Sequence, residues 1–246
     1  MPHTGRLLFG IILALAALAA TAAALAGQLA TVNHFQCYRV DPGTAWKPVA
    51  LALTTQFGTE KAAVGQLVVL CAPAHKNKSV VTNPAAHLAC YPIKAQGFQP
   101  KSVVITNQFQ TSAPMTVVAP VTLCVPSGKA VTTTAGPPLK PPLVKGLDNY
   151  ECFSVKSAGI ANHDIHVVDQ FGTANGSSLQ PLSLCAPAQV NGSPYVDSTT
   201  HLVCYGVKLG PDVKPTNVKI NNRFGIATAT VFKRQSLCVP STKKLG

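Results

Sequence analysis

Hydrophobic and polar residues alternate in short stretches along most of this chain. In residues 34–40 a Phe, a Cys and an Arg fall on one face, and a Tyr and a Val fall on the other. A period of two residues predicts a β-strand. Short β-branched runs at 103–106 and 166–168, and Leu-Cys stretches at 121–124 and 183–185, predict further strands with Pro and Gly between them. Only the apolar N-terminal segment has the character of a helix, so we expect an all-β protein.

The stretch at residues 33–40 recurs three more times. Each copy has a His or Asn, two further residues, a Cys, an aromatic residue, a spacer and a β-branched residue, and the later copies occupy residues 87–93, 149–155 and 201–207. The Cys residues follow the same rhythm, with gaps of 34, 19, 34, 28, 33, 19 and 34 residues. They are Cys37, Cys71, Cys90, Cys124, Cys152, Cys185, Cys204 and Cys238. A short repeat is therefore nested within a longer one.

Two further sequence features recur with the same spacing, and together with the Cys residues they define four units. A Phe in a polar turn follows the first Cys of each unit by 19 or 20 residues, and a Leu-Cys-x-Pro sequence closes the unit. The Phe residues are Phe57, Phe109, Phe171 and Phe224. We predict three strands in each unit. Because a three-stranded unit cannot bury both of its faces alone, we expect two units to pack as a pseudo-twofold sandwich or barrel.

The residues between the second and third units predict a domain boundary. Residues 128–146 contain four Pro, three Lys and no acid, a composition typical of an extended, solvated linker. We therefore expect two tandem domains, at residues 30–127 and 147–246. Each is predicted to be a disulfide-stapled β-sandwich or barrel made of two units.

The N-terminal residues 1–26 predict export from the cytosol. One Arg precedes an apolar run at residues 7–26, and Ala24 and Ala26 are the small residues that a signal peptidase recognises. The predicted location is therefore secreted, either extracellular or periplasmic. The same run is long enough to span a bilayer, so an N-terminally membrane-anchored protein is the alternative.

An even number of Cys in an exported chain predicts a disulfide framework. We favour pairing within each unit, because a unit must have been tolerated before it was duplicated. This pairing joins Cys37 to Cys71, Cys90 to Cys124, Cys152 to Cys185 and Cys204 to Cys238. Pairing Cys37 with Cys124 and Cys71 with Cys90 preserves the same symmetry and stays open. If all eight Cys belong to the framework, no thiol is left as a nucleophile.

No catalytic, metal or cofactor site stands out in the sequence. The His-x-x-Cys spacing is similar to that of zinc ligands, but these Cys are expected to be oxidised, and the third unit has Asn149 in place of His. Acids in one predicted domain do not align with acids in the other; Glu60, for example, falls opposite Asn175. No nucleophile elbow or phosphate loop occurs. We therefore expect no enzyme activity, no metal and no cofactor.

The net charge of +12 favours anionic partners. The candidate partners are anionic polysaccharides, lipid head groups or other polyanions, and too few spare aromatic residues remain for specific recognition of nucleic acid. The candidate ligand-binding residues are Trp46 with Lys47, and Lys76 with Lys78. For Trp46, the alternative is a loop aromatic that folds back onto the core.

These motifs resemble a family of uncharacterised secreted bacterial repeats, a domain of unknown function. The resemblance rests on the aromatic-x-Cys-Tyr-x-Val, Gln-Phe-Gly and Leu-Cys-x-Pro patterns and covers essentially the whole chain after residue 26. Gln110 in place of Gly, and Phe153 in place of Tyr, depart from these patterns. The resemblance implies an exported β-module, often repeated and without catalytic residues. We predict a secreted binding or structural module; the alternatives are a secreted enzyme or inhibitor whose site lies in variable loops.

Overall fold

The computed structural model describes residues 32–132, 140–157 and 162–246. These residues form thirteen β-strands and no helix, which confirms the prediction of an all-β fold. Accordingly, no helix among the described residues could cross a membrane. The predicted signal peptide, residues 1–26, lies outside the described residues.

Each of the four units contributes three or four strands. The first unit contains β1 (His34–Pro42), β2 (Val49–Thr55), β3 (Gly58–Val64) and β4 (Val69–Lys76). The second contains β5 (His87–Ala95), β6 (Lys101–Asn107) and β7 (Gln110–Val131). The third contains β8 (Asn149–Ser157), β9 (His163–Asp169) and β10 (Gly172–Val190). The fourth contains β11 (His201–Gly210), β12 (Thr216–Asn222) and β13 (Gly225–Leu245).

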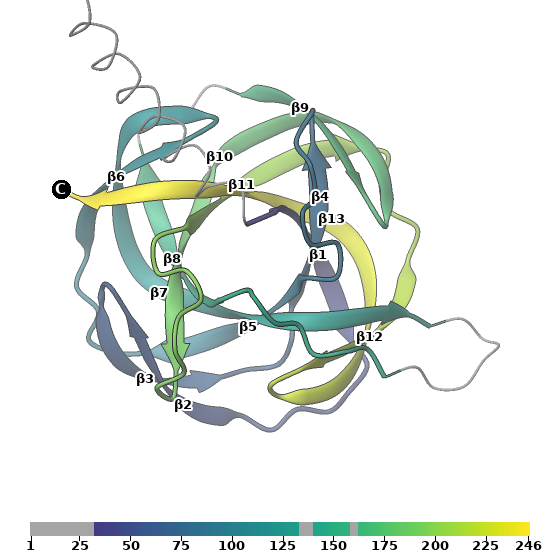
Figure 1. The fold of residues 1–246 in the computed structure, drawn as a ribbon, viewed down its shortest axis with the longest axis horizontal. Helices are drawn as coiled ribbons and strands as arrows, with labels where there is room; N and C mark the ends of the chain where they lie inside the picture. Colours follow the sequence, from purple (N-terminus) through teal and green to yellow (C-terminus); the bar gives the residue numbers. More distant parts are fainter. Residues whose placement is uncertain (1–31, 133–139, 158–161) are drawn as a thin grey trace, which may run out of the picture.

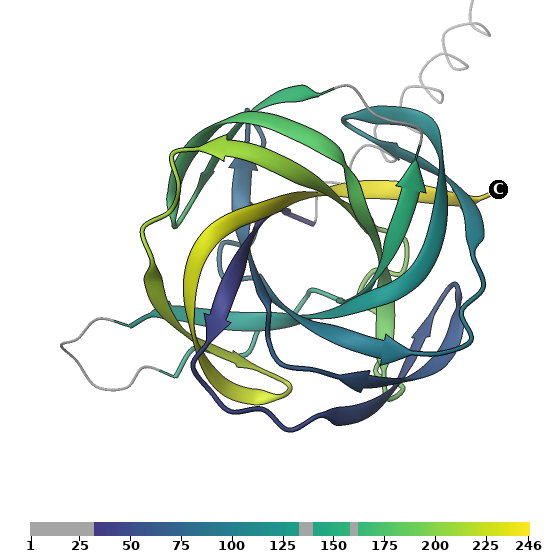
Figure 2. The ribbon, with the colours of Figure 1, turned by 180° about the vertical axis from the view of Figure 1, so that it is seen from behind.

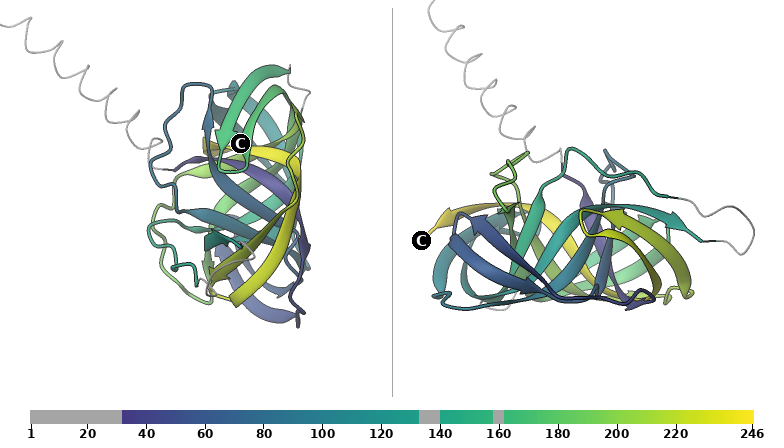
Figure 3. Two further views of the ribbon diagram at one scale, coloured as in Figure 1. Left: turned by 90° about the vertical axis from the view of Figure 1, so that its right-hand side faces the viewer. Right: turned by 90° about the horizontal axis from the view of Figure 1, so that it is seen from below.

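Eight of these strands close into one antiparallel barrel. Each unit contributes its first strand and the strand that carries its second Cys. The order around the barrel is β1, β4, β5, β7, β8, β10, β11 and β13, which returns to β1. Figures 1 and 2 view this ring from its two sides, and Figure 3 shows that the molecule is shallow in that direction. Closure leaves no unpaired edge in the ring.

The other strands form hairpins at the periphery of the ring (Figure 1). β2 pairs with β3, while β6, β9 and β12 pair with the first halves of β7, β10 and β13. Each hairpin is then extended by the end of a strand from the opposite unit: β10 pairs with β2, β13 with β6, β4 with β9 and β7 with β12. The first and third units therefore interlock, as do the second and fourth.

The predicted division into two tandem domains is not confirmed. β7 pairs with β8 and β1 pairs with β13, so strands from both sides of the expected boundary share one ring. The predicted linker, residues 128–146, also takes part. Its residues 128–131 pair with β12, and the carbonyl oxygen of Pro141 accepts a hydrogen bond of 2.7 Å from Asn221 Nδ2. A single closed ring satisfies edge strands that two smaller sheets would leave exposed.

All eight Cys lie at the centre of the barrel. The disulfides link the two Cys of each unit, which is the pairing favoured from the sequence: Cys37–Cys71, Cys90–Cys124, Cys152–Cys185 and Cys204–Cys238. Between neighbouring units the nearest sulfur atoms lie 3.5–3.9 Å apart. Disulfide bonds and sulfur contacts thus alternate around a closed ring of sulfur atoms. In the chain-entropy model, each disulfide stabilises the folded protein by about 3–4 kcal/mol, because it restricts a loop of this length in the unfolded chain.

Candidate functional site

Four equivalent aromatic clusters lie between the outer hairpins and the barrel wall. In each cluster the Phe of a hairpin turn packs against the aromatic residue that follows the first Cys of the opposite unit. The pairs are Phe57–Phe153, Phe109–Tyr205, Phe171–Tyr38 and Phe224–Tyr91, with ring centroids 4.9–5.0 Å apart. The edge-to-face geometry is favourable for aromatic pairs. It explains why a Phe recurs in an otherwise polar turn.

Three of the clusters are closed by a hydrogen bond to the Tyr hydroxyl. The partner is the residue two positions before the hairpin Phe, and it also accepts a hydrogen bond of 2.8–2.9 Å from the backbone N–H of that Phe. The pairs are Asn107–Tyr205, Asp169–Tyr38 and Asn222–Tyr91. Each buried hydroxyl is thereby satisfied, as buried polar groups require.

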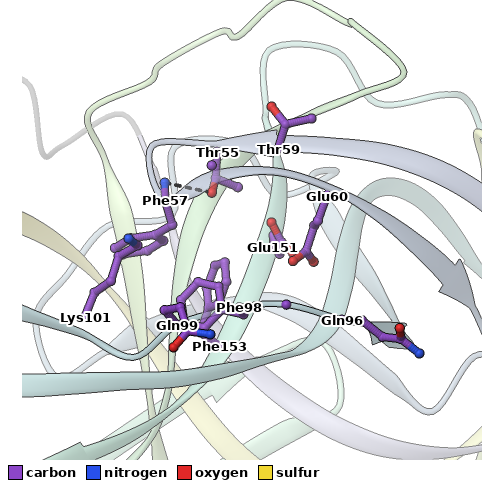
Figure 4. A pocket seen from close by; sticks show the side chains of 12 residues that line it. Thr55, Phe57, Thr59, Glu60, Gln96, Phe98, Gln99, Lys101, Glu151 and Phe153 are labelled. Carbon is purple, nitrogen blue, oxygen red and sulfur yellow. Dashed lines mark hydrogen bonds between the residues drawn. The ribbon is translucent and has the colours of Figure 1, made fainter.

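The remaining cluster, formed by Phe57 and Phe153 and called the Phe153 cluster below, lacks both partners of this hydrogen bond. Phe153 has no hydroxyl, and Thr55 stands where the other hairpins have Asn or Asp. Thr55 Oγ1 still accepts a hydrogen bond of 3.1 Å from the backbone N–H of Phe57. A cavity of about 170 Å³ lies here, lined by these residues and by Phe98 (Figure 4). Two departures from the repeat therefore coincide at one contact between units.

Two acidic residues meet in this cavity. Glu60 from β3 and Glu151 from β8 face each other (Figure 4). Glu151 is only 1% exposed. Burial, together with the hydrogen bond and the charge of Glu60, raises the pKa of Glu151 to about 9, so the pair holds a proton at neutral pH. One oxygen of each carboxyl group, Oε1, is buried without a hydrogen-bond partner among the described residues.

The other units show that the barrel does not require acids at this place. Glu151 immediately precedes the first Cys of its unit, where the other units have Gln36, Ala89 and Val203. Glu60 lies three residues after the hairpin Phe, where the third and fourth units have Ala174 and Ala227. Burying carboxyl groups is costly, yet the chain does so at one of four equivalent positions.

Sequence reasoning missed this pair because it compared acids only between the two predicted domains. Comparison of the four units at one position singles out Glu151. Its partner could not be found in this way, because nothing local in the sequence says that the first hairpin crosses to the third unit.

Lysines at one repeated position lie over the hairpin rings. Each is five residues after the second Cys of its unit, and the distance from its Nζ to the ring centroid is 4.4–4.9 Å. The pairs are Lys76–Phe109, Lys129–Phe171 and Lys243–Phe57. Burial lowers the pKa of Lys129 and of Lys243 to about 8. These cations belong to the packing of the clusters.

Lys76 and Lys78, predicted as a basic ligand-binding cluster, do not lie together at the surface. Lys76 is 5% exposed, because its ammonium group packs over the ring of Phe109. Lys78, beyond the end of β4, is exposed. The closeness of the two Lys in the sequence could not reveal that Lys76 packs against a hairpin from another unit.

Trp46 folds back onto the core, as its alternative interpretation predicted. Its ring centroid lies 5.2 Å from that of Tyr91 and 5.6 Å from that of Phe224, and its Nε1 donates a hydrogen bond of 3.1 Å to the carbonyl oxygen of Val64. Lys47 beside it is exposed. Trp46 therefore completes the Tyr91 cluster.

The His residues of the repeat link neighbouring units. Each bonds to the Gln that precedes a hairpin Phe, and the pairs are His34–Gln108, His87–Gln170 and His201–Gln56. Burial lowers the pKa of all three His to about 4, so they are neutral at pH 7. Among the described residues, the grouping of metal-type donors is Cys37, Cys71 and Cys238. All three are disulfide-bonded and offer no thiolate.

One end of the barrel carries another departure from the repeat. Arg39 and Lys233 lie directly opposite each other on β1 and β13, and both are exposed. The equivalents of Arg39 are Pro92, Ser154 and Gly206, and those of Lys233 are Gln66, Ala119 and Gln180. Like charges opposite each other across two strands are unfavourable. A bound anion would offset this repulsion.

Partly exposed apolar side chains lie in the depression that contains the two cations and in the cavity beside it. Val68, Val121, Leu182 and Phe232 are 37–43% exposed. A depression of about 590 Å³ contains Arg39, Lys233 and Phe232. It adjoins an axial cavity of about 180 Å³ whose lining includes all eight Cys. This end of the barrel, which we call the basic mouth, combines positive charge with exposed apolar surface.

Comparison with known families identifies the repeat. A family described as a repeat of unknown function (DUF7450) matches residues 87–240, more than half of the chain. The chain belongs to this family. The DUF7450 match begins at the first residue of β5 and ends with the Leu-Cys-x-Pro of the fourth unit, so it crosses the expected linker. The expected resemblance to an uncharacterised repeat family is confirmed. No curated protein and no solved structure matches the chain.

Proposed function

We propose that the protein is an exported binding module that holds an anionic polymer or an anionic lipid head group at its basic mouth. The observation that carries this proposal is the placement of Arg39 directly opposite Lys233. An anionic group between them would accept charge-assisted hydrogen bonds from both. The neighbouring exposed apolar residues would add contact area for a ligand with an apolar part.

The disulfides support export. All eight Cys are oxidised in four bridges, and no free Cys remains among the described residues. Such a framework persists in oxidising compartments and is rare in the cytosol. It is consistent with an extracellular location.

The carboxyl pair does not have the arrangement that a glycosidase requires. Glycosidases hold two carboxyl groups about 5 Å or more apart, on either side of the scissile bond. Glu60 and Glu151 instead hydrogen-bond to each other. Neither the retaining nor the inverting geometry is available to them in this arrangement.

The test neutralises the mouth with residues that the repeat already tolerates. Arg39→Ser introduces the residue of the third unit (Ser154), and Lys233→Gln introduces that of the first and third units (Gln66 and Gln180). The control, Lys61→Gln with Lys78→Gln, removes the same charge from two other exposed positions. Binding to immobilised heparin and to vesicles with an anionic phospholipid is measured from low to high salt.

We expect the mouth variant to bind more weakly than the control, with a salt dependence reduced by about two charge equivalents. Heparin binding without vesicle binding would identify a polymer, and the reverse would identify a lipid head group. Equal losses in the mouth variant and the control would contradict the proposal, because binding would then depend on total charge alone.

A further inference from the structure

We propose that the cavity between Glu60 and Glu151 binds the ammonium group of a small primary amine. This site lies in the Phe153 cluster and is independent of the basic mouth. Its lining comes from the first hairpin, from β8 and from the loop between β5 and β6. The first three units therefore all contribute to it.

The two carboxyl oxygens without a partner favour a ligand that donates hydrogen bonds. Glu60 Oε1 and Glu151 Oε1 are buried, and neither has a partner among the described residues. Glu151 is 1% exposed, so its carboxyl group can be reached only through the cavity that it lines. A primary ammonium group carries three donors and one positive charge. It could satisfy both oxygens and stabilise the negative charge of the pair.

The rings around the pair suit a cation with a short apolar stem. The ring centroids of Phe98 and Phe153 lie 5.0 Å apart, and those of Phe57 and Phe98 lie 6.2 Å apart. Phe57 and Phe98 are only partly buried, so they can meet a ligand at the opening. Aromatic faces attract ammonium groups. The volume of about 170 Å³ limits the ligand to a small molecule or to the end of a larger one.

Other charged groups near the cavity limit the rest of the ligand. Lys101 lines the opening, and Figure 4 shows it alongside Phe57 rather than between the carboxyl groups. Lys243 lies over the ring of Phe57, and Tyr195 is close enough to interact electrostatically with Glu151. The part of the ligand beside Lys101 is therefore expected to be neutral or negatively charged, as in an amino sugar or an amino acid.

The internal repeats argue that this pair is not required for folding. At the position of Glu151 the barrel accommodates Gln36, Ala89 and Val203, all of them buried. At the position of Glu60 it accommodates Ala174 and Ala227. A buried pair of carboxyl groups at positions where the other units have no acid is the kind of local conflict that marks functional sites.

Binding should release a proton to the buffer. The free pair holds one proton at neutral pH, because burial and the neighbouring carboxyl raise the pKa of Glu151 to about 9. An ammonium ion stabilises the fully ionised pair, so it displaces this proton. The affinity should therefore rise by up to about tenfold per pH unit below that pKa.

The test uses n-propylammonium as the probe and 1-propanol as its neutral match. Binding to the full oxidised protein is followed by NMR shifts of the amides of Glu60, Phe98 and Glu151 at pH 6, 7 and 8. Glu151→Gln introduces the residue of the first unit (Gln36), and Glu60→Ala introduces that of the third (Ala174). Asp212→Asn is the control, because it changes one exposed acid in a loop.

We expect n-propylammonium to shift these amides with an affinity that rises with pH, and 1-propanol to leave them unchanged. Either cavity variant should weaken binding by about tenfold or more and abolish its pH dependence, whereas Asp212→Asn should change neither. An unchanged spectrum with n-propylammonium at all three pH values would overturn the proposal. So would equal binding by Glu151→Gln, provided that its thermal unfolding shows it to be folded.

Discussion

The Tyr91 and Phe153 clusters share one architecture and differ in their polar groups. In the first, Trp46 and Phe224 pack on Tyr91, whose hydroxyl accepts a hydrogen bond of 2.9 Å from Asn222. In the second, Phe98 and Phe57 pack on Phe153 in the same arrangement, but no hydroxyl is present.

A carboxyl pair and a cavity lie beside the Phe153 cluster instead. The comparison teaches that the repeat fixes the aromatic packing, whereas the polar content of each cluster can change. The repeated contacts hold the barrel together, and the single departures from them are candidates for function.

The variants with the largest expected loss of stability at a fixed pH test whether the two clusters contribute equally to the free energy of unfolding. Phe57→Ala and Phe224→Ala each remove a ring that packs on the barrel wall. We expect each to lower the free energy of unfolding by about 2–4 kcal/mol, as measured by urea unfolding with the disulfides intact. The two losses should agree within about 1 kcal/mol. A large loss at one position only would contradict the equivalence of the clusters.

A second test asks whether the carboxyl pair of the Phe153 cluster makes the stability of the protein depend on pH. Because the pKa of Glu151 in the folded protein is raised to about 9, the protonated pair contributes stability below the unfolded pKa, and this contribution is lost as pH rises towards 9. Glu151→Gln removes the titration. We expect the variant to become more stable than the wild type as pH rises from 5 to 9.

The difference in stability between Glu151→Gln and the wild type should change by about 5 kcal/mol between pH 5 and pH 9, because each pH unit between the unfolded and folded pKa values contributes about 1.4 kcal/mol. The measurement is urea unfolding at each pH. The comparison variant is Gln36→Glu, which places an acid at the buried position of the first unit that corresponds to Glu151. If the difference between Glu151→Gln and wild type did not change with pH, the pair would titrate normally.

The smallest effect concerns the missing Tyr hydroxyl. Phe153→Tyr buries a hydroxyl beside Thr55, and we expect a loss of about 1–2 kcal/mol if no partner is available. Adding Thr55→Asn recreates the pair seen in Asn222–Tyr91. The double variant should recover about 1 kcal/mol relative to the sum of the single variants. Purely additive losses in a double-mutant cycle would show that the two positions do not meet as in the other clusters.

Hydrophobic alternation was enough to predict the strand character of the chain, and the rhythm of the Cys residues was enough to favour the observed pairing. The prediction of three strands in each unit holds for the last three units, whereas the first unit has four. Strand character and disulfide pairing are both local properties, since each bridge joins strands of one unit. The closure of four units into one ring was not predicted, because it depends on the pairing of β1 with β13 at opposite ends of the chain. The Pro-rich composition of residues 128–146 pointed to a solvated spacer, yet part of this segment completes the pairing of β12.

Side-chain environments were the hardest to predict. The exposure of Lys76 and the role of Trp46 depend on hairpins that arrive from other units. The meeting of Glu60 with Glu151 depends on the same interlocking of the first and third units. A pattern of polar positions within one unit carries no information about these contacts.

The most direct test of this account is the titration of the carboxyl carbons of Glu60 and Glu151, followed by ¹³C NMR in the full oxidised protein. The account predicts that the pair loses its second proton far above the ordinary range of a carboxyl group, with an apparent pKa of about 9. In Glu60→Ala the pKa of Glu151 should move down, because the hydrogen bond and the charge of Glu60 are lost, but burial should keep it above the ordinary range. Ordinary titration of both carboxyl groups, with apparent pKa values of about 4–5, would contradict the claim that the Phe153 cluster holds a proton-sharing pair.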